Sequence, residues 1–254
     1  EMLQLYLSLT YVAGENTFFR GLKKLLPGRY LIWQDGKLEI HRYWKPEFHP
    51  DESKTLEDWA DEIHNTLKEI MPEVKTADEK VESFLSGGVD SSYVLAMSDA
   101  EQADSCGYEE ERFDESVLAE KTAKILGRKF SRSLITPEQF FDIVPYVMYN
   151  MEQPLGDASA IVFTLGCNAT AEHTKICYSG EGADEFFGGY NMYRNAERYG
   201  ENLKTFYVGN TNIMKEDEKK KILKKYDPDV LPIEVAREIY EETEGLDPLS
   251  KMSD

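Results

Sequence analysis

Residues 86–92, Ser-Gly-Gly-Val-Asp-Ser-Ser, make a short segment that is suited to holding a phosphate group. Two adjacent glycines let successive backbone N–H groups converge on an anion, and the start of a following helix adds the positive end of its dipole. The hydroxyl groups of Ser86, Ser91 and Ser92 can donate hydrogen bonds to the same oxygens. Asp90 would repel a phosphate, so we expect it to bind Mg²⁺, which proteins hold with one or two carboxylates plus phosphate oxygens.

Two alternatives compete with this interpretation of the segment. A P-loop requires Gly-Lys-Ser/Thr, whereas here Val-Asp-Ser follows the glycine pair and no lysine is nearby. The simpler alternative is a tight turn between a strand and a helix that binds no ligand. The pattern favours a pyrophosphate site over both.

A second segment, residues 178–190, gathers acidic side chains beside glycines. Ser179 and Gly180 can approach a nucleotide closely. Three carboxylates follow within five residues: Glu181, Asp184 and Glu185. They would repel one another without a divalent cation or a positively charged substrate amine. The alternative is a solvated acidic loop with a hinge at residues 188–189, and this segment alone does not decide between the two.

The pattern of strands and helices positions both segments. The predicted strands are residues 81–85, 103–108, 129–135 and 175–178, and the predicted helices are residues 91–98, 115–126, 136 onward and 158–173. Strands that alternate with helices predict a parallel sheet with helices on both faces, in which ligands bind beyond the carboxyl ends of the strands. Both segments follow such ends, so we expect them to share one edge of the sheet.

The beginning and the end of the chain have a different character. Residues 30–40 contain two apolar runs separated by Asp-Gly, which predicts a β-hairpin. Residues 46–53 predict a linker, and Thr55 with Asp58 forms a capping box that predicts the start of a helix. Residues 200–254 are mainly charged and helical in pattern, with a solvent-exposed helix in the run from Lys215 to Lys225.

Composition limits the partners of the chain. Its 254 residues are 41% hydrophobic and 30% charged, which is ordinary for a globular protein, and carry a net charge of −19. Such an acidic surface repels nucleic acid, so no nucleic-acid partner is expected. The longest apolar run, at residues 158–165, is far shorter than the roughly 20 residues of a membrane span. Because no signal peptide is recognisable either, we expect a cytoplasmic protein without a membrane partner.

The cysteines do not predict a disulfide or a metal site. There are three of them, Cys106, Cys167 and Cys177, without the spacing of a zinc site. Three reduced thiols are therefore expected.

Taken together, the two segments resemble a known enzyme family. Residues 86–91 resemble the pyrophosphate loop of the ATP-pyrophosphatase superfamily. Residues 179–185, followed by Phe-Gly-Gly-Tyr, resemble the second signature of the glutamine-hydrolysing asparagine synthetases. Residues 152–160 are similar to the same family, and residues 11–44 are similar to the last strands of its glutaminase domain. The resemblance extends to about residue 193.

The resemblance implies two domains. Residues 49–254 are expected to form the ATP-dependent synthetase domain, with an adenine nucleotide α-hydrolase-like fold, and residues 1–48 a short β-rich remnant of the glutaminase domain. The family's glutaminase nucleophile is an amino-terminal cysteine, whereas this chain begins with Glu1 and its first cysteine is Cys106. The chain is therefore interpreted as a fragment that lacks the glutaminase start and the carboxyl-terminal end, and it is expected to make little or no asparagine alone.

The resemblance also implies an activity. In this family ATP adenylates the side-chain carboxylate of aspartate to β-aspartyl-AMP with release of pyrophosphate, and ammonia derived from glutamine then gives asparagine. We accordingly expect a ligase that uses ATP, Mg²⁺, aspartate and ammonia, and a homodimer of the full-length protein is left open. The alternatives are a sister enzyme that adenylates another carboxylate, such as a β-lactam synthetase or a peptide-cyclising homologue, and a non-catalytic nucleotide-binding remnant.

Carried over to this chain, the resemblance assigns roles to individual residues. Glu181 is expected to be catalytic, in forming the β-aspartyl-adenylate. Asp90 and Asp184 are expected to bind Mg²⁺. The residues expected to bind ATP and pyrophosphate are Phe84, Leu85, Ser86, Gly87, Gly88, Asp90, Ser91, Cys106, Ser179 and Gly180.

Overall fold

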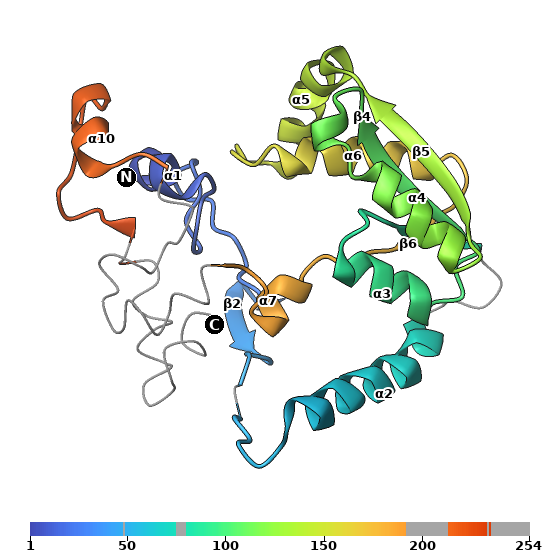
Figure 1. Ribbon diagram of the computed structural model, residues 1–254. Coiled ribbons are helices and arrows are strands. Elements are labelled where there is room, and N and C mark those ends of the chain that lie inside the picture. The colour runs from blue at the N-terminus through green and yellow to red at the C-terminus, as the bar shows by residue number, and fades with distance from the viewer. Residues whose placement is uncertain (48, 75–79, 192–212, 233, 235–254) are drawn as a thin grey trace. The chain divides into compact units, whose positions relative to one another are not determined.

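The computed structural model describes residues 1–47, 49–74, 80–191, 213–232 and 234 (Figure 1). The chain forms two compact units. The first unit comprises residues 1–49, 148–156 and 185–254, and the second comprises residues 50–147 and 157–184. The boundary expected near residue 48 between a glutaminase remnant and a synthetase domain stays a prediction.

A four-stranded parallel sheet forms the centre of the second unit, with the strand order β5-β4-β3-β6. The strands are β3 (Val81–Phe84), β4 (Gln102–Tyr108), β5 (Lys129–Ile135) and β6 (Ile176–Tyr178). Each lies within one residue of a strand predicted from the sequence. Because β3 pairs with both β4 and β6, the segments that follow β3 and β6 leave the sheet side by side.

Helices cover both faces of this sheet. On one face, Leu85 and Ala103 pack in the apolar core with Leu95 of α3 (Val89–Met97) and with Ala119 of α4 (Ser116–Ile125). On the other face, the rings of Phe84 and of Phe163 in α6 (Ser159–Thr170) lie 5.2 Å apart. Successive strand residues point to opposite faces, so the two contacts belong to opposite sides of the sheet. The predicted α/β class, a parallel sheet with helices on both faces, is confirmed.

Local signals in the sequence explain where the helices begin and end. In α2 (Leu56–Val74), the Thr55 backbone donates to Asp58 Oδ2 at 2.8 Å and the Asp58 backbone donates to Thr55 Oγ1 at 3.2 Å, so the predicted capping box is confirmed. Pro137 opens α5 (Pro137–Met151) in its first turn. None of the described helices is both long and apolar enough to cross a membrane.

The first unit contains the predicted hairpin and an additional helix. Strands β1 (Arg29–Gln34) and β2 (Lys37–Arg42) pair antiparallel around the Asp-Gly turn, which confirms the hairpin. The helix predicted between Lys215 and Lys225 is present as α10 (Glu216–Ile222), but it is not solvent-exposed throughout, because Lys219 is fully buried. Most of residues 200–254 lie outside the described residues. Helix α1 (Met2–Leu9) was not predicted.

Hydrogen bonds connect α1 to residues 219–230, which lie more than 200 residues away in the chain. The Gln4 side chain donates to the carbonyl oxygens of Asp227 and Val230 at 2.7 and 2.8 Å, and it accepts from the Asp227 backbone at 3.0 Å. Lys219, whose side chain is fully buried, donates to Ser8 Oγ at 2.6 Å. Hydrogen bonds between distant segments thus hold this part of the first unit together.

Candidate functional site

The loop after β3 is closed by its own serines. The Ser86 backbone N–H donates to Ser91 Oγ at 3.2 Å, and the two hydroxyl oxygens lie 3.0 Å apart. The Gly88 N–H donates to Ser86 Oγ at 3.2 Å. Since Ser91 is buried and the rest of the loop is largely exposed, these hydrogen bonds fix the base of the loop and leave its outer side open. A loop preorganised in this way loses little conformational entropy when it binds an anion.

The start of α3 offers backbone donors at the same place. Gly88 is the N-cap residue in an extended conformation, and its lack of a side chain leaves the first turn without a side-chain cap. The first N–H groups of a helix have no partner within the helix and attract anions through the helix dipole. Asp90, in this first turn, is exposed.

Helix α4 supports the loop from the side. Gly87 has a φ of +86°, and a Cβ built on it would lie 2.9 Å from the Ala119 backbone nitrogen and 3.1 Å from Leu118 Cβ. The loop therefore needs glycine at this position both for its backbone conformation and for its close approach to α4.

Gly180 joins the second segment directly to the first. A Cβ at Gly180 would lie 2.7 Å from the Ser91 nitrogen and 2.9 Å from the Asp90 carbonyl carbon. These are backbone atoms, which cannot rotate away as a flexible side chain can. The two segments that the sequence places far apart are thus in van der Waals contact at the carboxyl ends of the neighbouring strands β3 and β6.

The rest of the second segment turns sharply into α7 (Ala183–Phe187). The Glu181 N–H donates to Ser179 Oγ at 3.2 Å, and Gly182 has a φ of +91°. Glu181 is exposed and Asp184 is partly buried. Within the described residues no three His, Cys, Asp or Glu side chains are grouped as a metal site.

The expected nucleotide contacts from β3 and β4 fall on both faces of the sheet. Cys106 lies under α6, where its Sγ is 3.8 Å from the Val162 carbonyl oxygen and burial raises the pKa of its thiol. The Phe84 ring packs under the same helix. The Leu85 side chain points into the opposite core and is 2% exposed, so only its backbone is open to a ligand.

Sequence reasoning missed a pair of acidic residues inside the sheet. Glu82 in β3 is fully buried, its Oε1 is paired with Lys80, and its Oε2 has no hydrogen-bond donor among the described residues. Asp104 in β4 accepts hydrogen bonds from Gln102 and Thr170 at 3.1 and 3.3 Å. Burial, and then the neighbouring Glu82, raise the pKa of Asp104 to about 6.

The two carboxyl groups therefore share a proton at mildly acidic pH. Burial alone would raise the pKa of Glu82, but hydrogen bonding with Asp104 and Lys80 lowers it below its usual range. A proton on Asp104 provides a donor for the hydrogen bond to the Glu82 side chain. The signal in the sequence was a charged residue in each of two strands expected to be covered on both faces.

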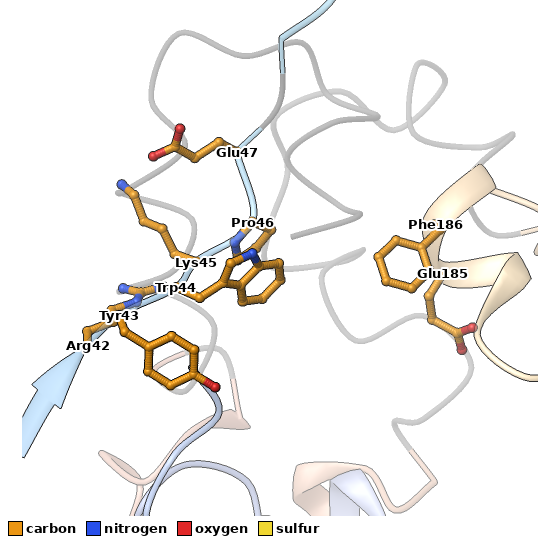
Figure 2. A pocket seen from close by; sticks show the side chains of 8 residues that line it. All are labelled: Arg42, Tyr43, Trp44, Lys45, Pro46, Glu47, Glu185 and Phe186. Carbon is orange, nitrogen blue, oxygen red and sulfur yellow. The ribbon is translucent and has the colours of Figure 1, made fainter. Parts of the chain in front are cut away.

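A separate pocket of about 960 Å³ lies in the first unit (Figure 2). It is lined by Arg42, Tyr43, Trp44, Lys45, Pro46, Glu47, Glu185 and Phe186. Figure 2 shows the rings of Trp44 and Phe186 on facing sides of it. None of the residues expected to bind ATP or Mg²⁺ lines this pocket.

A glycine loop and an acidic segment that meet at the carboxyl edge of a parallel sheet are typical of α/β proteins that bind nucleotides. Comparison with known proteins identifies the class more closely. The family model described as Asparagine synthase matches residues 62–247, and the chain belongs to this family.

Individual relatives agree with the family. The chain is 30% identical over 294 residues to asparagine synthetase [glutamine-hydrolyzing] 1 of Bacillus subtilis, covering 99% of this chain and 46% of that protein. It is 26% identical over 292 residues to a putative asparagine synthetase [glutamine-hydrolyzing] of Mycobacterium tuberculosis, with 98% and 45% covered. The chain thus spans about half the length of these curated relatives.

A search of solved structures matches an NH3-dependent NAD synthetase from Campylobacter jejuni. The sequences are 16% identical, the TM-score is 0.36, and the match covers 77% of this chain and 91% of that one.

Proposed function

We propose that this chain is the ATP-using synthetase part of an asparagine synthetase, which adenylates the side-chain carboxylate of aspartate. The observation that carries the proposal is the contact of Gly180 with the backbone of Asp90 and Ser91, which unites the two signature segments in one site. Membership of the asparagine synthase family supports the reaction class. The names of the relatives support aspartate as the acid and glutamine as the source of ammonia.

In the proposed reaction the protein positions two anions and stabilises the leaving group. The N–H groups of the loop and of the first turn of α3 bind the β- and γ-phosphates, where negative charge accumulates as pyrophosphate leaves. Ser179 and Gly180 border the nucleotide on the side of β6, and Phe84 and Cys106 border it on the side of α6. Holding the carboxylate in line with the α-phosphorus then lowers the entropic cost of the reaction.

Glu181 follows the point at which the two segments touch, and we assign it to the aspartate end of the site. Its carboxylate is exposed, while its backbone is held by Ser179. An exposed carboxylate at this position can pair with the α-amino group of aspartate or with the attacking ammonia. Formation of the amide in the second step releases AMP.

The donor set at this edge of the sheet fits Mg²⁺. Asp90 and Asp184 offer only oxygen ligands, and Mg²⁺ takes one or two carboxylates together with phosphate oxygens and water. A ready-made group of three protein ligands is therefore not required. When bound, Mg²⁺ neutralises charge on the phosphates.

Pyrophosphate exchange into ATP tests the proposed function. We expect exchange that depends on aspartate and Mg²⁺, measured with labelled pyrophosphate against a panel of carboxylic acids. Glu181→Gln should abolish exchange and retain ATP binding, because it keeps the size of the side chain and removes its charge. Exchange with other acids but not with aspartate would identify a sister enzyme, and ATP binding without any exchange would identify a non-catalytic remnant.

The metal role of Asp90 makes a separate prediction. In Asp90→Asn, we expect ATP affinity in the presence of Mg²⁺ to fall about fivefold, and ATP affinity in EDTA to stay the same or to rise, because a repelling charge is removed. Calorimetric titration under both conditions measures the difference. Asp99→Asn, an equal change of charge just beyond the other end of α3, is the control and should leave both affinities unchanged. Equal losses with and without Mg²⁺ would count against a metal ligand.

A further inference from the structure

A buried carboxylate outside the proposed ATP site lies where three elements of the second unit meet. The side chain of Asp114 is 3% exposed and forms an ion pair with Arg132 of β5. It accepts hydrogen bonds from the Ser116 backbone and hydroxyl at 3.0 and 2.5 Å, and from the backbone of Tyr108 at the end of β4. The hydrogen bond from the Ser116 hydroxyl is the largest cause that lowers the pKa of Asp114, so this carboxylate stays charged.

These groups are packed tightly onto the backbone of β4. A Cβ at Gly107 would lie 2.7 Å from Arg132 Nε, 2.9 Å from Asp114 Oδ1 and 2.9 Å from Ser116 Oγ. No side chain larger than that of glycine fits beneath the ion pair without moving it. Asp114 therefore has little freedom, and through Ser116 it fixes where α4 begins.

The start of α4 is in turn the surface on which the glycine loop rests. Ala119 is the fourth residue of α4 and is completely buried, and its backbone nitrogen is the atom nearest to a Cβ placed on Gly87. Since even an added Cβ at Gly87 would overlap with this nitrogen, the Gly87 backbone lies directly against α4. A displacement of α4 toward the loop therefore crowds this contact, and a displacement away from the loop removes the support.

We infer that Asp114 is a positioning residue for the pyrophosphate loop, acting through α4 and Gly87 without touching the nucleotide. The inference rests on the proposed function, since it assumes that the loop binds the phosphates of ATP. Arg132 contributes to the same positioning, because its ion pair holds the Asp114 carboxylate against the sheet. If Asp114 has this role, substituting it should weaken the binding of phosphate groups more than the binding of aspartate.

The test is Asp114→Asn, which keeps the side-chain size and one acceptor but loses the ion pair. We expect the Kd for ATP and for pyrophosphate to rise about fivefold, and the KM for aspartate in the exchange reaction to stay within twofold of the original chain. Asp58→Asn, which weakens the capping box of α2 in the same unit, is the matched control. It should lower the urea midpoint without changing either constant.

A double substitution tests whether Asp114 affects ATP binding through Gly87. If Asp114 acts through Gly87, then Asp114→Asn combined with Gly87→Ala should weaken ATP binding no more than Gly87→Ala alone, because the two changes disturb one contact. Arg132→Gln, at a partly exposed position, provides a milder variant if Asp114→Asn does not fold, and we expect about a twofold rise in the Kd for ATP.

Unchanged ATP affinity in both Asp114→Asn and Arg132→Gln would overturn the inference, and so would an equal loss in Asp58→Asn. Failure of the proposed function gives a different result, because the unsubstituted chain would then bind neither ATP nor pyrophosphate.

Discussion

Gly180→Ala is expected to weaken ATP binding by a factor of about 5–150 while the protein remains folded. The added Cβ would overlap with the backbone of Asp90 and Ser91 at 2.7–2.9 Å, so either the loop after β3 or the segment after β6 must move. Overpacking of this kind costs on the order of 1–3 kcal/mol, which corresponds to a factor of about 5–150 if the cost falls on the binding-competent arrangement. Titration with ATP by calorimetry, with circular dichroism as the check on folding, measures the effect.

Gly127→Ala is the matched control for this substitution. Gly127 follows α4 in the same unit, and a Cβ there would meet no atom within 4 Å. Its φ of +68° makes alanine strained by about 1 kcal/mol, so the control loses stability without touching the loop. If both variants bind ATP equally well, the contact between the two segments has no role in forming the site.

Asp104→Asn is expected to stabilise the protein at pH 8 by about 2 kcal/mol and to flatten its stability between pH 5 and 8. The pKa of Asp104 is about 6 in the folded protein and ~3.9 in an unfolded chain. Between these values the folded state binds a proton that the unfolded state does not, so this stabilisation is complete below pH ~4 and is lost as the pH rises through about 6. Above that pH, two adjacent buried carboxylates carry charge.

The lowered pKa of Glu82 has the opposite effect on stability. Its stabilising contribution is present above pH ~4.3 and is lost as the pH falls. The pair therefore stabilises the fold most at mildly acidic pH. Asparagine at position 104 donates to Glu82 at every pH and removes the dependence.

Urea unfolding at several pH values, followed by circular dichroism, checks this expectation. Glu120→Gln removes an exposed carboxylate of α4 and should leave the pH profile as it is. The quantity to compare is the difference in unfolding free energy between the unsubstituted chain and Asp104→Asn. If this difference is the same at pH 8 as at pH 5.5, the two carboxyl groups do not interact in solution.

The parallel sheet could be predicted because its signals are local. Each strand is a short run bounded by turn residues, and each helix begins or ends at a recognisable position, such as the capping box at Thr55 and Asp58. The order of the strands in the sheet is harder to predict from the sequence. The sequence indicated that β3 and β6 end at the same edge, but their pairing depends on tertiary packing, which no local signal encodes.

The candidate site was predicted as two segments, and their contact was not. Glycine at position 180 was expected to allow a nucleotide to approach, which stays a prediction, and the structure shows that it also allows the other segment to approach. The buried pair of Glu82 and Asp104 was not predicted, because charged residues are normally assigned to the surface. Only the register between β3 and β4 brings these two carboxyl groups together.

The hydrogen bonds between Gln4 and the backbone near Asp227 have a consequence for how the chain is made. Translation proceeds at about 5–20 residues per second, so α1 leaves the ribosome roughly 10–45 seconds before the segment to which it is fastened. During that interval the amide of Gln4 and the hydroxyl of Ser8 are without these partners, whereas all four strands of the parallel sheet are synthesised before the interval ends. Helix α1 therefore gains these contacts only after the strands of the parallel sheet have been synthesised.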